Sequence, residues 1–157
     1  MKFKTLGTPG NPAVLFFHAM GVTGDSSLPV AKVLAEKYYC ILPTSSVYCK
    51  GQKYVGKGDE VRQIKRFLEK EGTDHLALVV ASSIGVDLAM EFLTKSKIKV
   101  EHLKYRDAVK KAYPKANFPI FEGMNHMQYQ IRDPKGFASM LETVVEENRL
   151  PELPFLK

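Results

Sequence analysis

The chain has 157 residues, enough for one domain with a sizeable hydrophobic core. Its composition, 45% hydrophobic and 25% charged, is that of an ordinary soluble protein, and no apolar run approaches the length that spans a bilayer. Because the chain opens without an apolar signal region, we expect a cytoplasmic protein with a single domain covering residues 1–157.

The net charge of +6 is concentrated in one segment of the chain. Between Lys95 and Lys115, eight basic residues face only two acidic ones, which accounts for the whole excess. Such a segment could attract an anionic partner, but lysines on a solvated helix face or an edge strand are the commoner meaning. No binding motif accompanies the charge, so we expect neither a nucleic-acid nor a membrane partner.

The two cysteines, Cys40 and Cys49, are too few for a disulfide framework, and their separation matches no usual metal site. Cys40 lies in an apolar run and is expected to be buried. Cys49 lies in a loop, where it could be reactive. The histidines show no metal-ligand spacing either, and the sequence implies no cofactor and no metal.

Apolar runs alternate with helical patterns along the chain, which predicts an α/β fold with a mostly parallel sheet of about six strands flanked by helices. We expect strands at 3–6, 13–18, 38–42, 76–80, 98–100 and 118–121. We expect helices at about 28–38 with Ser27 as cap, from Asp59 to Gly72, from Gly85 to Thr94, at 105–113, and from Asp133 onward.

Residues 44–58, between a strand and a helix, are rich in glycine, lysine and tyrosine. A mobile loop is the commoner meaning of this composition, and a loop that contacts substrate is the other, because ligands bind at the carboxyl ends of parallel strands. A flavodoxin-like or Rossmann-like nucleotide binder is disfavoured, since the chain has no glycine-rich phosphate loop.

The stretch LALVVASSIG at residues 76–85 predicts a buried strand that turns at once into a helix. Such a sharp turn strains its central residue and requires small residues two positions away, a condition that Ala81 and Gly85 meet about Ser83. The pattern resembles the nucleophile elbow of the α/β-hydrolase family, which implies Ser83 as nucleophile. The other interpretation is a plain turn whose Ser82 or Ser83 caps the helix.

A second resemblance to this family lies in the loop after the second strand. That loop begins with His18, Ala19 and Met20, where the family often has His-Gly. The resemblance implies that the backbone amides of Met20 and Ile84 bind the oxyanion of a tetrahedral intermediate. We expect His18 to support the loop through hydrogen bonds rather than to take part in the chemistry.

His126 provides the third resemblance, because it follows the last expected strand and precedes the last helix, where the family places its catalytic histidine. The family's acid follows the preceding strand, so Glu101, just after residues 98–100, is the first candidate and Asp107 the second. Both lie among lysines and could instead form only local ion pairs.

Residues 96–117 are enough for one strand and one helix, where the family has two such units and often a cap. A natural short form and an engineered deletion are both compatible with this. The resemblance implies a serine hydrolase that cleaves an ester or related acyl bond in a small, accessible substrate. The alternative is a hydrolase-like scaffold without efficient turnover, used for binding or interaction. A sheet edge or apolar surface exposed by the shortening could join copies into a homo-oligomer.

Overall fold

The structure is a computed structural model that describes residues 1–103 and 127–155. Within these residues one mixed sheet has the strand order β1-β3-β2-β4-β5. The strands are β1 (Lys2–Leu6), β2 (Ala13–Phe17), β3 (Tyr39–Thr44), β4 (His75–Ala81) and β5 (Lys99–Leu103). β1 is antiparallel to β3, and the other neighbouring pairs are parallel. The predicted mostly parallel α/β sheet is confirmed, while the strand expected at 118–121 lies outside the described residues.

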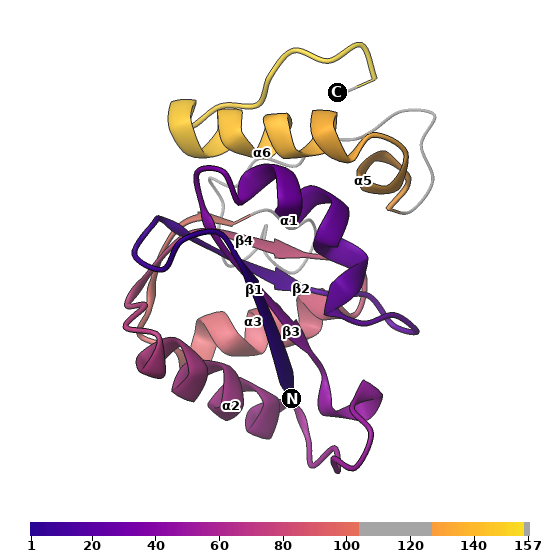
Figure 1. Cartoon of the computed structure of the whole chain (residues 1–157), viewed down its shortest axis with the longest axis vertical. Coiled ribbons are helices and arrows are strands. Elements are labelled where there is room, and N and C mark those ends of the chain that lie inside the picture. Colours follow the sequence, from indigo (N-terminus) through magenta and orange to yellow (C-terminus); the bar gives the residue numbers. More distant parts are fainter. Residues whose placement is uncertain (104–126, 156–157) are drawn as a thin grey trace.

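Helices cover both faces of the sheet, with α1 and α6 on one face and α2 and α3 on the other (Figure 1). The described helices are α1 (Leu28–Leu34), α2 (Lys57–Lys70), α3 (Gly85–Lys95), α5 (Gln128–Arg132) and α6 (Pro134–Glu147), with short 3-10 helices η1 (Gly24–Ser27) and η2 (Ser46–Tyr48). None of these helices is both long enough and apolar enough to cross a bilayer.

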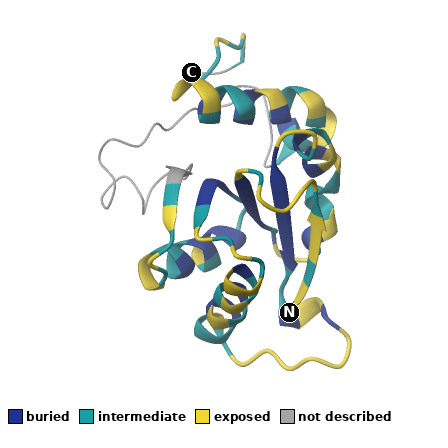
Figure 2. Ribbon diagram, turned by 60° about the vertical axis from the view of Figure 1, so that its left-hand side comes forward, coloured by how far each residue is buried: buried dark blue, intermediate teal, exposed yellow. Residues whose placement is uncertain are grey.

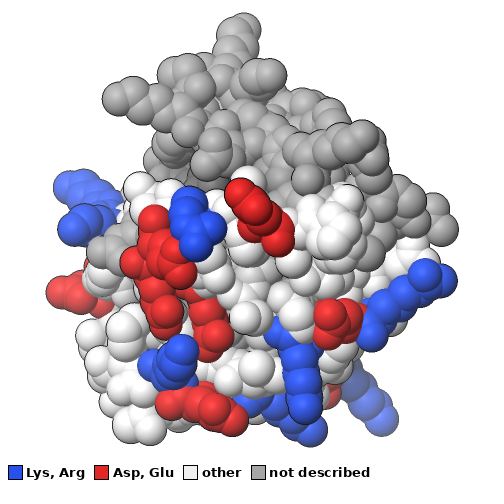
Figure 3. Space-filling model, turned by 90° about the horizontal axis from the view of Figure 1, so that it is seen from above, with Lys and Arg blue, Asp and Glu red and all other residues white. Residues whose placement is uncertain are grey.

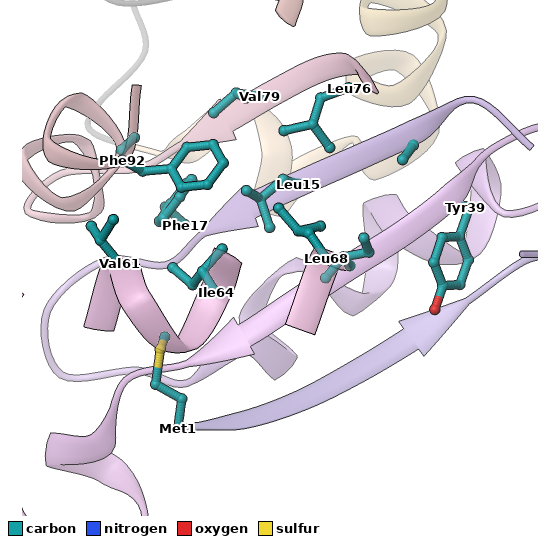
Figure 4. Close-up of a cluster of buried hydrophobic side chains, with 13 residues drawn as sticks. Met1, Leu15, Phe17, Tyr39, Val61, Ile64, Leu68, Leu76, Val79 and Phe92 are labelled. Atoms are coloured by element: carbon teal, nitrogen blue, oxygen red, sulfur yellow. The ribbon is translucent and has the colours of Figure 1, made fainter. Parts of the chain in front are cut away.

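The central strands are buried on both faces, as their continuous apolar runs predict (Figure 2). On one face Leu15 and Phe17 of β2 pack against Ile64 of α2 and Phe92 of α3 (Figure 4). Leu15, Ile64 and Phe92 are each 0% exposed. Burial of each such side chain contributes about 1.5–3 kcal/mol to stability, so this cluster fixes α2 and α3 to the sheet.

On the opposite face, Val14 of β2 and Cys40 of β3 pack against Met140 and Leu141 of α6. Burial raises the pKa of the Cys40 thiol to about 12. At the surface of this layer acidic and basic side chains are interspersed, with acidic groups gathered on one side in the view from above (Figure 3). Ion pairs from Lys37 to two glutamates of α6 belong to this layer.

The predicted start of α1 at residue 28 is confirmed, with Ser27 in the N-cap position, whereas the predicted start of α2 is wrong. Ser27 does not cap α1 with its side chain, because it is the last residue of η1, which runs directly into α1. Asp59 does not cap α2, because that helix begins at Lys57. The carboxylate of Asp59 instead accepts hydrogen bonds from the side chains of Gln63 and Arg62, and these bonds lower its pKa.

Two further boundaries and one additional helix differ from the prediction. α1 ends at Leu34 rather than near residue 38, and β5 continues to Leu103 rather than ending at residue 100. Helix α5 was not expected, because its five residues carry no apolar periodicity. The start of α6 is confirmed, since the Asp133 carboxylate accepts a hydrogen bond of 2.8 Å from the Gly136 N–H.

Candidate functional site

The connection from β4 to α3 consists of residues 82–84. Ser83 has φ = 52°, in the left-handed region that a residue with a side chain adopts at a cost of about 1–2 kcal/mol. The turn is closed by hydrogen bonds from Gly85 N–H to Ser82 O at 2.9 Å and from Val86 N–H to Ser83 O at 3.1 Å. The backbone strain expected of this sharp turn is therefore present, and it is located at Ser83.

Gly85 packs directly against the backbone at the end of β2. A Cβ atom at this position would lie 2.5 Å from the carbonyl oxygen of His18 and 2.6 Å from that of Phe17. The Ser82 N–H donates a hydrogen bond of 2.9 Å to the same Phe17 oxygen. The expected need for a small residue at position 85 is thus confirmed, and its cause is contact between two backbones.

The two amides expected to bind an oxyanion come from the ends of β2 and β4. Met20 lies in the loop after β2, and Ile84 is the residue that follows Ser83. Neither amide N–H donates a hydrogen bond within residues 1–103 and 127–155. Both residues are exposed.

His18 connects the loop after β2 to the loop after β3. Its Nε2 accepts a hydrogen bond of 3.1 Å from the Ser45 N–H, and its Nδ1 lies 2.8 Å from the Ala19 carbonyl oxygen, so the ring proton belongs on Nδ1. The Tyr48 ring packs edge-on against the imidazole, with the ring centres 5.5 Å apart. The Tyr48 hydroxyl accepts a hydrogen bond of 2.8 Å from the Gly21 N–H. The expected supporting role of His18 is confirmed.

A cavity of about 310 Å³ opens beside the loop after β2. Apolar side chains form most of its wall. It is lined by Met1, Phe17, His18, Met20, Pro43, Ser45, Val47, Tyr48, Tyr54, Lys57, Glu60, Ile84, Gly85, Asp87 and Leu88. Several of these come from residues 44–58, so this loop forms one wall. Ser83 itself is absent from the lining, although its neighbours Ile84 and Gly85 belong to it.

Each charged side chain that lines the cavity has a partner. The Lys57 ammonium lies 2.9 and 2.8 Å from the two carboxylate oxygens of Asp87, and this hydrogen-bonded pairing raises the pKa of Lys57. The Glu60 carboxylate is 1% exposed and accepts a hydrogen bond of 3.2 Å from the Ser46 N–H. In the described part of the chain no three or more His, Cys, Asp or Glu side chains are grouped so that they could hold a metal ion.

Of the two candidate acids, only Glu101 lies in the described part of the chain. Glu101 is the third residue of β5 and lies within the strand rather than beyond its carboxyl end. The expected end of this strand at residue 100 is therefore wrong, while the role of Glu101 stays a prediction. Asp107 and His126 lie outside the described residues.

The chain that follows His126 does reach the turn. The Ser82 hydroxyl donates a hydrogen bond of 3.4 Å to Oε1 of Gln130 in α5. Behind this contact, Tyr129 is buried and packs edge-on against Phe155 with ring centres 5.0 Å apart. No motif signalled the contact, because Gln130 belongs to a short helix without apolar periodicity.

Cys49 differs from the expectation of a reactive loop thiol. It is 4% exposed, and its Sγ donates a hydrogen bond of 3.5 Å to the Thr44 carbonyl oxygen. Loop residues of mixed composition gave no signal that the side chain would turn inward. Both cysteines are free and buried, so neither is a candidate nucleophile.

No protein-family model matches the sequence, and no curated protein matches it. Solved structures do match. A protein described as an α/β-hydrolase family member from Desulfitobacterium hafniense has a TM-score of 0.60 and 20% identity, over 96% of this chain and 56% of its own. The 2-hydroxy-6-oxo-6-phenylhexa-2,4-dienoate hydrolase of a Rhodococcus species has a TM-score of 0.55 and 19% identity, over 62% of this chain and 38% of its own.

A thioesterase domain from the curacin biosynthetic pathway has a TM-score of 0.55 and 20% identity, over 71% of this chain and 45% of its own. Epoxide hydrolase and dehalogenase structures match at similar levels. The chain therefore has the α/β-hydrolase fold. It spans 56% of the length of the Desulfitobacterium protein and less of the other two, which fits the shortened form expected from residues 96–117.

Proposed function

We propose that the chain is a serine hydrolase that cleaves an ester or related acyl bond, with Ser83 as the nucleophile. The observation that carries the proposal is the left-handed backbone at Ser83, held by the packing of Gly85 against the end of β2. Strain of this kind persists only where the surroundings over-determine it, and it clusters at active sites. Ser83 is also partly exposed, so a substrate can reach it.

In the proposed reaction the Ser83 Oγ attacks the carbonyl carbon of the substrate while His126 takes the hydroxyl proton. The carbonyl π electrons move onto oxygen to form the tetrahedral oxyanion. Collapse of this intermediate expels the alcohol, which receives the proton from His126. Water then attacks the acyl-enzyme with His126 again as base, and a second collapse releases the carboxylic acid and returns the proton to Ser83.

The Met20 and Ile84 amides are the proposed oxyanion donors. They support the proposal because both N–H groups are without a partner in the described residues and lie at the ends of adjacent strands, β2 and β4. The hydrogen bonds of His18 and Tyr48 hold the loop that carries Met20 in place before substrate arrives. Electrostatic stabilisation of an oxyanion requires donors that are positioned in advance in this way. Loss of one such donor typically lowers kcat by about 10²–10³.

His126 is supported as the base by the contact between Ser82 and Gln130, which brings the chain just after His126 to the turn. For the acid we propose Asp107 ahead of Glu101, since β5 extends to Leu103 and the position after the strand lies beyond Glu101. This acid would orient the imidazole and stabilise its cation, and no cofactor or metal enters the proposed reaction.

A fluorophosphonate probe, which modifies activated serines, tests the proposal. We expect stoichiometric labelling at Ser83, none in Ser83→Ala, and labelling at least about a hundredfold slower in His126→Ala. Ser27→Ala is the control, because it removes a serine hydroxyl that makes no cap hydrogen bond and lies outside the turn, and it should leave labelling in place. Absence of labelling on protein that is folded by circular dichroism would refute the proposed nucleophile.

The second candidate is a hydrolase-like scaffold that binds a ligand without efficient turnover. Two observations favour it: Glu101 lies inside β5, and the chain spans 56% or less of the structures compared above. A folded, unlabelled protein that still binds a ligand in the cavity beside the turn would establish this candidate instead.

A further inference from the structure

We propose that the cavity beside the turn, called here the acyl cavity and defined by the lining residues given above, binds an uncharged aliphatic acyl chain of about six to ten carbons. This inference rests on the proposed function and names the substrate class of the same site. It is argued below from the position of the cavity, from its charges and from its size.

The position of the acyl cavity relates it to the reacting carbonyl. Met20 and Ile84, whose amides are the proposed oxyanion donors, both line it, and Gly85 forms part of its wall. A substrate carbonyl bound by those amides would therefore have one substituent directed at the cavity. We assign the acyl chain to it, because the acyl group stays on the enzyme until hydrolysis, whereas the alcohol must leave to admit water.

The charges of the acyl cavity select an uncharged chain. Lys57 and Asp87 neutralise each other, and the Glu60 carboxylate accepts a backbone hydrogen bond. The N-terminal ammonium of Met1, which also lines the cavity, donates its hydrogen bonds to the side chains of Ser46, Gln52 and Gln63. Both ring nitrogens of His18 are also engaged by backbone groups. A charged ligand would lose its hydration without gaining a free counter-charge, which is costly among apolar side chains.

The size of the acyl cavity sets the chain length. Its volume of about 310 Å³ is at the lower end of the range for small-molecule sites, roughly 300–1,000 Å³. A water-sized group takes about 30 Å³, so the cavity holds on the order of ten such groups. Val47, Tyr48 and Leu88 provide apolar wall against which each added methylene can be buried.

Nitrophenyl esters that share one leaving group and differ in acyl length test the proposal. We expect kcat/KM to rise from acetyl by up to about fourfold per methylene, to level off near octanoyl or decanoyl, and to fall for longer chains. An ester of equal length that ends in a carboxylate should be at least tenfold poorer. A flat series, or a length dependence found only when the alcohol is varied, would overturn the assignment.

Two matched variants locate the binding. Val47 lines the acyl cavity, whereas Val55 lies in the same loop, is 69% exposed and is not part of the lining. We expect Val47→Trp to lower kcat/KM for the octanoyl ester at least tenfold, with the acetyl ester changed less than twofold. Val55→Trp should leave both values unchanged. Equal effects of the two substitutions would overturn the proposal.

Binding to Ser83→Ala separates this inference from the proposed function, because it requires no turnover. Calorimetric titration with nitrophenyl octanoate should show saturable binding that Val47→Trp weakens at least tenfold and Val55→Trp does not. This result on a wild-type chain that fluorophosphonate fails to label would sustain the acyl cavity and refute the hydrolase. Labelling of Ser83 without saturable octanoyl binding would sustain the nucleophile and refute the acyl cavity.

Discussion

Two connections at the same end of the sheet lead from a strand to a helix, and they are built differently. The β4–α3 connection, residues 82–84, is held by backbone packing and carries its strain on Ser83. The β3–α2 connection, residues 45–56, is a long and largely exposed loop (Figure 2). It is held by side chains, among them His18 and Tyr48. The short connection fixes one residue in space, whereas the long one forms a wall that can change without moving that residue.

The largest expected effect comes from breaking the short connection with Gly85→Ala. The new methyl group would meet the carbonyl oxygens of Phe17 and His18, which belong to the backbone and cannot rotate away. We expect a loss of about 3 kcal/mol in the free energy of unfolding, measured by urea denaturation. Gly58→Ala is the control, because its nearest neighbour, the Lys95 ammonium, lies 3.8 Å away. That variant should gain up to about 1 kcal/mol, and equal losses would contradict the backbone contact.

The second-largest effect is expected from His18→Ala, which removes a hydrogen bond that holds the long connection. This change leaves the partly buried Ser45 N–H without its acceptor, and we expect a loss of about 1–2 kcal/mol. Amide hydrogen exchange should accelerate at Ser45 and stay slow at Ser82, whose N–H bonds to Phe17 O. Faster exchange at both amides would mean that the two connections are not independent.

Cys40, in the strand that precedes the long connection, makes the free energy of unfolding depend on pH. Burial raises the pKa of Cys40 from 9.0 to about 12, so the unfolded thiol loses its proton first as the pH rises. Stability due to this group is complete below pH 9 and is lost as the pH rises toward about 12, with a loss of about 1 kcal/mol between pH 8 and pH 10. Cys40→Ala should flatten this part of the stability curve, and an unchanged slope would assign it to other groups.

The smallest effect is a gain in stability at the short connection. Ser83→Gly should raise the free energy of unfolding by about 0.5–1 kcal/mol, because glycine adopts φ = 52° without the steric cost but loses more entropy on folding. Ser83→Ala keeps the strain and should leave stability within about 0.5 kcal/mol of the wild type. If both variants were equally stable, strain at Ser83 would not be a property of the folded chain.

The sequence predicted the strands and helices whose patterns are strong. The buried runs that became β2 and β4 and the amphipathic pattern of α2 needed no other part of the chain to be recognised. Boundaries were less predictable, because they depend on local hydrogen bonds. Asp59 was predicted as a cap, yet α2 starts at Lys57, after Gly56 with φ = 145°. The N-cap thus lies three residues earlier than predicted, and the Asp59 carboxylate is bonded to side chains instead.

The candidate site was predictable only where a local pattern marks it. Ala81 and Gly85, spaced about Ser83, pointed to the strained turn, because the crowding is set by neighbours in sequence. The acyl cavity was indicated only in part, by the composition of residues 44–58, since its lining joins residues from Met1 to Leu88. The error over the end of β5, expected at residue 100, has the same origin: the length of this strand is decided by its pairing with β4, which the sequence of the strand does not contain.

The packing of α6 has a consequence for the order in which the protein can be assembled. The sheet surface around Val14, Cys40 and Leu78 is complete once the first 81 residues have been made, but Met140 and Leu141, which cover it, come near the end of the chain. During synthesis the part of this apolar surface that α1 does not cover therefore stays exposed until α6 has been made, and a chain that stops before α6 would be prone to aggregate.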